Sequence, residues 1–159
     1  MILKLRQRMA QEESGFTLVE LLVVMLILGI LAAIAIPAFF NQRNKATDSQ
    51  AKTSARTAET AIETYATDHA GKYTGATAAG LKAIEETLND ADLQTPYATD
   101  TTYTVAVKTA GPSGFYFGIS RSGGQTSLKC GPNYNSGTGV ITTQAAAVDG
   151  CPAGGDWSQ

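Results

Sequence analysis

Glu20 is the only charged residue between Phe16 and Phe40, a run of about 25 mostly apolar residues. A carboxylate at the centre of a bilayer costs about 2.5–3.5 kcal/mol on insertion scales. The cost is lower near a helix N-terminus, because the helix dipole favours negative charge there. A cation in the same apolar surroundings would offset the remainder. Glu20 therefore indicates ion pairing inside an apolar environment, and the alternative is an acid that serves only the helix start.

Cleavage between Gly15 and Phe16 would supply such a cation, because it creates a new α-amine on Phe16. That amine would precede Glu20 by four residues, about one helical turn. Cleavage at this point also keeps the apolar run in the mature chain.

The apolar run from Phe16 to Phe40 would measure about 37 Å as a helix, which is enough to cross a hydrocarbon core with some tilt. A secretory signal peptide cut after Ala35 is an alternative, since Ala33 and Ala35 form a small-residue site. The length of the run, the acid Glu20 and the position of Pro37 all disfavour this alternative.

The segment Gly15-Phe16-Thr17-Leu18-Val19-Glu20, followed by the apolar residues Leu21 to Ile36, resembles the prepilin signature of type IV pilins and pseudopilins. The short leader is similar to that of the type IVa branch. The resemblance covers about the first third of the chain. It implies that a prepilin peptidase cuts after Gly15 and N-methylates Phe16. It also implies that Glu20 pairs with the Phe16 amine of a neighbouring subunit.

The same resemblance implies three parts of the chain: a removed leader at 1–15, a transmembrane and filament-core half-helix at 16–40, and a globular head at 41–159. The expected partners are other copies of the chain in a helical filament, the prepilin peptidase, an assembly platform with its ATPase motor, and the lipid bilayer before assembly. The head is expected outside the cytoplasm, first on a single-pass membrane protein and later in an extracellular pilus.

The helix is expected to continue past the apolar run, because residues 41–69 contain strong helix formers and neither glycine nor proline. Small and apolar residues recur there at helical spacing and predict a stripe that packs on the rest of the head. The stripe comprises Ala51, Ala55, Ala58, Ile62 and Tyr65. The opposite face is predicted to carry Lys52, Arg56, Glu59 and Glu63.

Pro37 is expected to bend or loosen this helix, because proline lacks the N–H that would bond to the Ala33 carbonyl. Gly29, about two turns earlier, adds a second weak point. Both residues are predicted sites of a helix kink.

After Gly71 the pattern predicts a short helix around 78–89, a loop at 90–100 and an antiparallel meander. The expected strands are 103–107, 115–120 and 125–130, with a loop at 131–139 and a short fourth strand at 140–143. The predicted fold class is α+β, with a long N-terminal helix packed on a small antiparallel sheet, as in pilins.

Two cysteines, Cys130 and Cys151, are expected to form a disulfide in an exported domain. A metal site is disfavoured, because the only histidine, His69, is distant in sequence. Asp149 and Asp156 flank Cys151, but their spacing matches no calcium loop, so we expect no cofactor and keep calcium as the weaker alternative.

The charge of −2 indicates no nucleic-acid-binding surface, and no catalytic constellation or phosphate-binding loop is present. The predicted function is structural, as a subunit of a type IV pilus, of the major kind, serving motility, adhesion or DNA uptake. A type II secretion pseudopilin is the first alternative, and a monomeric membrane-anchored binding domain is another. Tyr134 and Trp157 are either exposed adhesive residues or packed at the sheet edge.

Overall fold

The computed structural model describes residues 15–158 and contains one dominant helix, α2 (Leu18–Asp68). The contacts divide the chain into two compact units between Phe39 and Phe40. Helix α2 ends where Gly71, at a φ of +79°, donates its N–H to the Ala66 carbonyl oxygen at 2.8 Å. Glycine suits this left-handed position, which closes the helix end.

In the first unit, α2 carries apolar side chains in every direction, and its residues up to Phe39 are all exposed. Among the described residues, α2 is the one helix long and apolar enough to cross a membrane. Pro37 and Gly29 both lie inside α2. The kink that they predict stays a prediction.

The second unit, which we call the head, contains a five-stranded sheet in its described part, with the order β1-β3-β4-β5. Strand β2 shares the β1 edge of β3. All pairs within this sheet are antiparallel, so the predicted fold class is confirmed. The strands are β1 (Asp92–Leu93), β2 (Tyr97–Ala98), β3 (Tyr103–Lys108), β4 (Tyr116–Ser122) and β5 (Gln125–Gly131).

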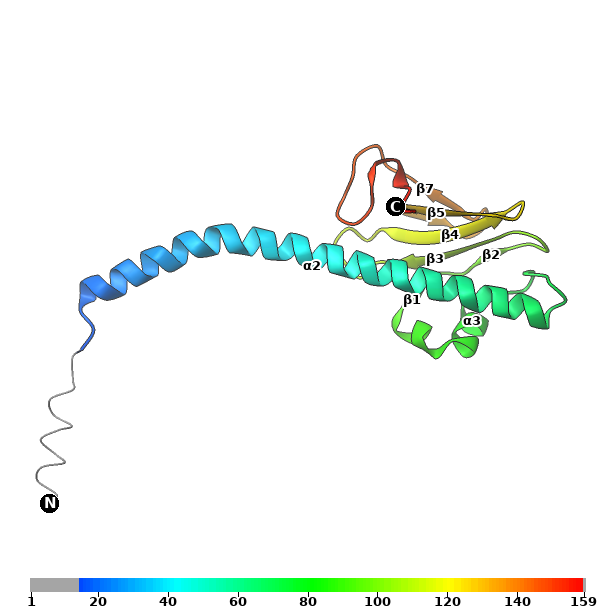
Figure 1. Ribbon diagram of the computed structural model, residues 1–159, viewed down its shortest axis with the longest axis horizontal. Helices are drawn as coiled ribbons and strands as arrows, with labels where there is room; N and C mark the ends of the chain where they lie inside the picture. The colour runs from blue at the N-terminus through cyan, green and yellow to red at the C-terminus, as the bar shows by residue number, and fades with distance from the viewer. Residues whose placement is uncertain (1–14, 159) are drawn as a thin grey trace, which may run out of the picture. The chain divides into compact units, whose positions relative to one another are not determined.

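One face of this sheet packs against the part of α2 that belongs to the head (Figure 1). The sheet contributes alternate residues of β3 and β4 to this core, among them Val105 and Phe117. The helix contributes a stripe of small residues that lets the two backbones approach closely. The buried members of the stripe are Ala51, Ala55, Ala58, Ala61, Ile62 and Ala66. The predicted stripe is therefore confirmed, with Tyr65 half-buried at its edge.

The other face of the sheet is also covered, which the alternating pattern of β3 did not predict. Strand β3 is buried at all positions from Tyr103 to Val107. A hairpin of β6 (Asn133–Asn135) and β7 (Val140–Thr142) forms a second, two-stranded sheet, so the predicted loop at 131–139 is wrong in part. The Ile141 side chain of this hairpin lies so close to Gly118 that a Cβ there would collide with it.

The region between helix and sheet also differs from its prediction. The expected helix at 78–89 divides into α3 (Ala78–Ile84) and the 3₁₀ helix η1 (Glu86–Asp90), because Glu85 adopts extended backbone angles between them. The expected loop at 90–100 contains β1 and β2. Leu93 is buried in the core, and this burial anchors β1 to the edge of β3. The last helical element is η2 (Ala153–Gly155).

Candidate assembly site

Glu20 and Thr17 form a reciprocal cap at the N-terminal end of α2. The Glu20 N–H donates to Thr17 Oγ1 at 3.2 Å, and the Thr17 N–H and hydroxyl both donate to Glu20 Oε2 at 3.4 Å. This is the capping box of a Thr-x-x-Glu sequence, a signal that the sequence analysis missed. The contacts to the carboxylate are long, so they hold it weakly and leave it able to accept a stronger donor.

Gly15 and Phe16 precede this cap and are exposed, the Phe16 side chain at 81%. A Cβ added at Gly15 would meet no atom within 4 Å. The fold of this chain therefore places no steric demand for glycine there, and any such demand must come from another protein. The rest of the predicted leader, residues 1–14, lies outside the described residues.

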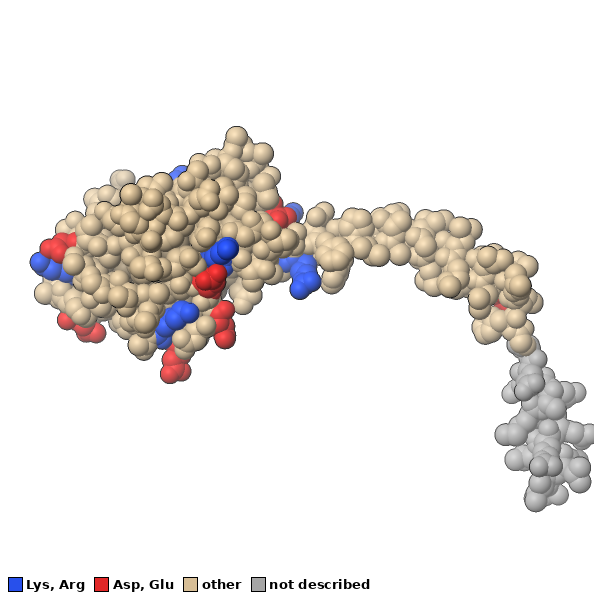
Figure 2. Space-filling model, turned by 180° about the vertical axis from the view of Figure 1, so that it is seen from behind, with Lys and Arg blue, Asp and Glu red and all other residues tan. Residues whose placement is uncertain are grey.

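The surface that follows the cap is a helix of exposed aliphatic and aromatic side chains. Figure 2 shows this part of α2 as tan, without blue or red atoms except near the N-terminal end. Large side chains along it, from Leu18 to Phe39, remain about half to three quarters exposed. An exposed apolar surface of this extent marks a site of contact with other molecules or with a membrane.

In the head, a disulfide joins Cys130 of β5 to Cys151, as predicted. Both cysteines are fully buried. The turn before Cys151 is held to α2, because the Gly150 N–H donates to Asp48 Oδ2 at 2.8 Å. Asp48 is only 1% exposed, and its other oxygen, Oδ1, has no partner among the described residues. A Cβ at Gly150 would lie 2.7 Å from the Asp48 Cβ, so the fit requires glycine.

Glu63, predicted to lie opposite the small-residue stripe of α2, is the centre of a polar cluster. Its carboxylate accepts hydrogen bonds from the Tyr73 hydroxyl at 2.9 Å, the Tyr103 hydroxyl at 3.0 Å and the Arg121 guanidinium. Partial burial acts to raise the Glu63 pKa, but these hydrogen bonds outweigh burial and lower it below its usual value. Burial, followed by the bond to Glu63, raises the pKa of Tyr103.

Lys52, which is half-buried, and Arg56, which is exposed, both lie beside aromatic rings of the head. The Lys52 ammonium lies 5.5 Å from the centroid of the Phe117 ring, and the Arg56 guanidinium lies 5.3 Å from that of Trp157. Burial lowers the pKa of Lys52, although the nearby Asp48 acts to raise it. The four residues predicted opposite the stripe all lie outside the buried core, and Lys52 and Glu63 are half-buried because residues of the head extend beside the helix.

Trp157 is not an exposed adhesive residue. Its side chain is only 4% exposed, and its indole N–H donates to the Lys129 carbonyl oxygen at 2.9 Å. Tyr134 is half-buried, and its hydroxyl donates to the Thr95 carbonyl oxygen at 3.0 Å. Both aromatic residues therefore serve packing at the sheet, which was the second of the two predicted roles.

The two acids considered for calcium have different surroundings. Asp156 pairs with the Lys129 ammonium at 3.3 Å, while Asp149 occupies a turn at a φ of +50°. Hydrogen bonds from Ser158, followed by Lys129, lower the Asp156 pKa. Among the described residues, no group of three or more metal-binding side chains is close enough to hold an ion.

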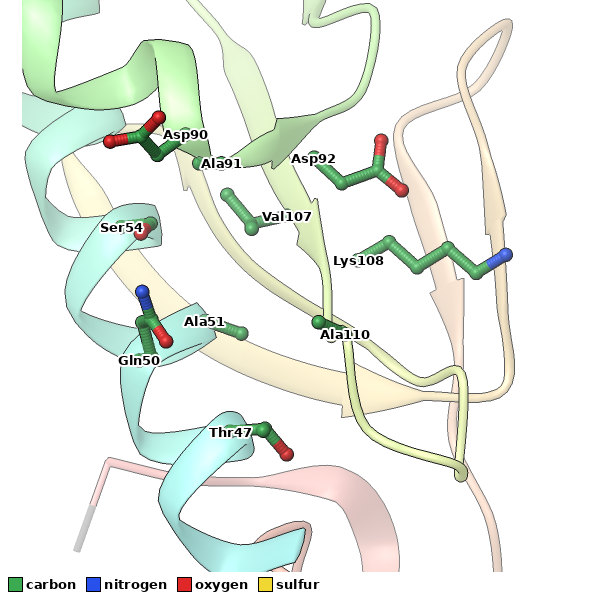
Figure 3. Close-up of a pocket in the computed structure, with 10 residues that line it drawn as sticks. All are labelled: Thr47, Gln50, Ala51, Ser54, Asp90, Ala91, Asp92, Val107, Lys108 and Ala110. Atoms are coloured by element: carbon green, nitrogen blue, oxygen red, sulfur yellow. The ribbon is translucent and has the colours of Figure 1, made fainter. Parts of the chain in front are cut away.

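A small groove of about 120 Å³ lies between α2 and the region from η1 to β3 (Figure 3). Its polar side chains do not converge. Figure 3 shows Asp92 and Lys108 extending away from Gln50 and Ser54, and Asp90 pointing to another side. The groove offers no nucleophile beside a base, which catalysis of acyl transfer would need.

Comparison with known proteins places the similarity in the N-terminal part. Residues 11–36 match the family model of the prokaryotic N-terminal methylation motif. The chain is 43% identical over 58 residues to the type IV major pilin protein PilA of Myxococcus xanthus, covering 36% of this chain and 26% of that protein. It is 39% identical over 75 residues to a fimbrial protein of Neisseria meningitidis, covering 46% and 44%.

A secretion protein is about equally similar. The chain is 36% identical over 74 residues to the type II secretion system core protein G of Vibrio cholerae, covering 46% of this chain and 49% of that protein. The chain thus spans less than half the length of each of these relatives. The methylation motif, these likenesses and a long helix packed on an antiparallel sheet support a place for the chain in the superfamily of type IV pilins and type II secretion pseudopilins.

Proposed function

We propose that this chain is a structural, non-enzymatic subunit of a type IV pilus, assembled from the membrane into a helical surface filament. The observation that carries the proposal is the exposed apolar half of α2, which begins with a single acid four residues after Phe16. In the membrane, lipid covers this surface. In the filament, the same surfaces of neighbouring subunits cover each other, so no new apolar area has to meet water.

Processing after Gly15 prepares the Phe16 amine for this assembly. The peptidase, rather than the fold, requires glycine, since a Cβ at Gly15 meets open space. The Glu20 carboxylate is held only by long contacts within its own helix, so exchange for the amine of a neighbour costs little. An ion pair in an apolar core is strong when both charges are present and costly when one is removed.

Mass spectrometry of the mature chain tests the processing step. The expected N-terminus is N-methylated Phe16. A mature chain that begins at Ile36 would instead support a secreted protein cut after Ala35, and retention of residues 1–15 would contradict processing altogether.

Glu20→Gln tests the pairing, because glutamine keeps the capping box but removes the charge. Filament formation should be lost or strongly reduced. Thr17→Ala is the matched control, since it removes the cap and keeps the charge, and it should assemble nearly normally. Equal filament yields for Glu20→Gln and the unmodified chain would refute the pairing. Loss in Thr17→Ala alone would assign Glu20 to the helix start.

A pseudopilin of a type II secretion system is the second candidate, favoured by the likeness to core protein G. The disulfide between Cys130 and Cys151 favours a pilin, since major pseudopilins resemble this chain in the first third but typically use calcium in the head. Electron microscopy separates the two, because a pilin predicts long surface filaments labelled by an antibody to the head. Filaments seen only on overproduction of the secretion system would favour the pseudopilin.

A further inference from the structure

The helix stretch that follows the apolar run carries exposed charge of one sign. Asp48 is the only acidic residue between positions 21 and 58 of the sequence. Its side chain is buried and accepts a hydrogen bond from the Gly150 N–H. Arg43 and Lys45 are both exposed, and neither takes part in a salt bridge among the described residues. Each of these cations therefore faces solvent without a protein counter-charge.

The position of these two cations along α2 matches the far surface of a bilayer. From Leu18, where α2 begins, to Arg43 the helix rises about 37 Å, and Lys45 lies about 3 Å further. A bilayer with its headgroups is about 40–45 Å thick. A helix that starts at one surface therefore brings Arg43 and Lys45 to the headgroup layer of the other.

The positive charge of Arg43 and Lys45 is also opposite to the usual distribution of basic residues across a membrane. Basic residues near a span gather on the cytoplasmic side. In the proposed orientation, however, Arg43 and Lys45 lie on the opposite side, so membrane topology does not explain them. A contact that needs positive charge on that side does explain them.

A groove in the head opens beside Arg43. It has a volume of about 400 Å³ and lies between α2 and the turn that joins β3 to β4. Arg43, Asn44 and Thr47 line it from the helix, and Gly111 and Pro112 from the turn. The Asn44 amide has no hydrogen-bond partner among the described side chains, so a guanidinium and an amide are both available to phosphate oxygens.

We propose that Arg43 and this groove bind the headgroup of an anionic phospholipid while the chain waits in the membrane, and that Lys45, on another side of the helix, adds to the attraction for anionic lipid. The Arg43 guanidinium meets the lipid phosphate, and the apolar wall at Pro112 contacts the glycerol and upper acyl region. The inference rests on the membrane-anchored state in the proposed function and not on the filament. It adds to the membrane-anchored state the class of lipid that the groove beside Arg43 selects.

The test uses the mature chain in phosphatidylcholine bilayers with a minority of phosphatidylglycerol and a spin-labelled form of each lipid. Electron paramagnetic resonance measures the motionally restricted lipid, and hence the preference for the anionic label. The unmodified chain should show a preference that falls with salt. Arg43→Gln/Lys45→Gln should lower the preference by about five-fold per residue.

Lys72→Gln/Lys82→Gln is the matched control, because it removes the same charge from the turn after α2 and from α3. It should keep the preference. Flotation with vesicles verifies insertion of every variant. A chain that does not float contradicts the membrane state itself, whereas a chain that floats without a preference overturns only the lipid site. Unchanged lipid preference with lost filaments in Arg43→Gln/Lys45→Gln would also overturn it and assign the two cations to a second copy.

Discussion

The two halves of α2 have the same backbone but opposite surroundings. Up to Phe40 the helix carries large aliphatic and aromatic side chains, and they are exposed. From Ala51 to Ala66 its inward face carries small residues, and they are buried. The size of the side chains in each half matches what that half packs against. Alanine lets the helix backbone lie close to the sheet of the same chain. Bulky side chains suit a partner that the single chain lacks, either lipid or other helices.

The acids of the two halves differ in the same way. Asp48 and Glu63 are held by groups far away in the sequence, Gly150 and Arg121. Glu20 is held only by Thr17, within one turn of its own helix. These two acids of the head are therefore held by tertiary contacts, whereas the N-terminal half keeps a carboxylate that a neighbour can engage.

The largest effect on the head is expected from removal of the disulfide. Cys130→Ala/Cys151→Ala opens a loop with a sequence separation of 21 and should lower the free energy of unfolding by about 3 kcal/mol. Urea unfolding in detergent measures it, with the fluorescence of Trp157, the only tryptophan, as the signal. Vesicle insertion of the apolar half should not change. An equal loss of both properties would contradict the independence of the two halves.

A matched pair of substitutions compares the helix halves directly. Ala55 is fully buried, so Ala55→Leu should overpack the core and destabilise the head by about 1–3 kcal/mol. Ala33 is exposed, so Ala33→Leu should leave the unfolding of the head unchanged. The same urea titration measures both variants. Similar unfolding midpoints for the two would contradict the proposed difference between the helix halves.

Loss of the Asp48 carboxylate should release the turn at Gly150. Asp48→Ala leaves the Gly150 N–H without its acceptor, which costs about 1–3 kcal/mol for a buried group. Asp48→Asn keeps an acceptor and should cost less. Hydrogen exchange at the Gly150 amide measures the release. Unchanged protection in Asp48→Ala would mean that the disulfide alone holds the turn.

The smallest expected effect is on the stability of the head at acidic pH. The pKa of Glu63 is lowered in the folded head, so its stabilisation is complete above its ordinary pKa of 4.5 and is lost as pH falls through the lower, folded value. Glu63 is 37% exposed, so the contribution should be below about 1 kcal/mol. Glu59 acts in the opposite sense, because burial raises its pKa.

Thermal unfolding between pH 3 and pH 6 measures this contribution. Glu63→Gln should flatten the acid side of the profile relative to the unmodified chain. Glu59→Gln is the control and should make that side no flatter. A Glu63→Gln profile that stays parallel to the original would exclude Glu63 as the titrating group.

Local patterns in the sequence were sufficient for several features. The long apolar run, the acid Glu20 and the small-residue stripe each follow from composition or helical spacing, because a helix repeats every 3.6 residues and shows its faces in the chain. The pairing of Cys130 with Cys151 followed from there being just two cysteines. The capping box at Thr17 was equally visible in the sequence, as a Thr-x-x-Glu pattern.

Only the tertiary structure decided which polar residues of the head meet. Glu63 and Arg121 are 58 positions apart, and Asp48 and Gly150 are 102 apart. Neither pairing leaves a periodic trace, because each depends on how the C-terminal strands fold back beside α2. The same holds for the second face of the sheet, where the hairpin of β6 and β7 packs and strand β3 is buried from Tyr103 to Val107. The surface of the N-terminal half of α2 needed no such information, because its apolar side chains are exposed and the sequence alone lists them.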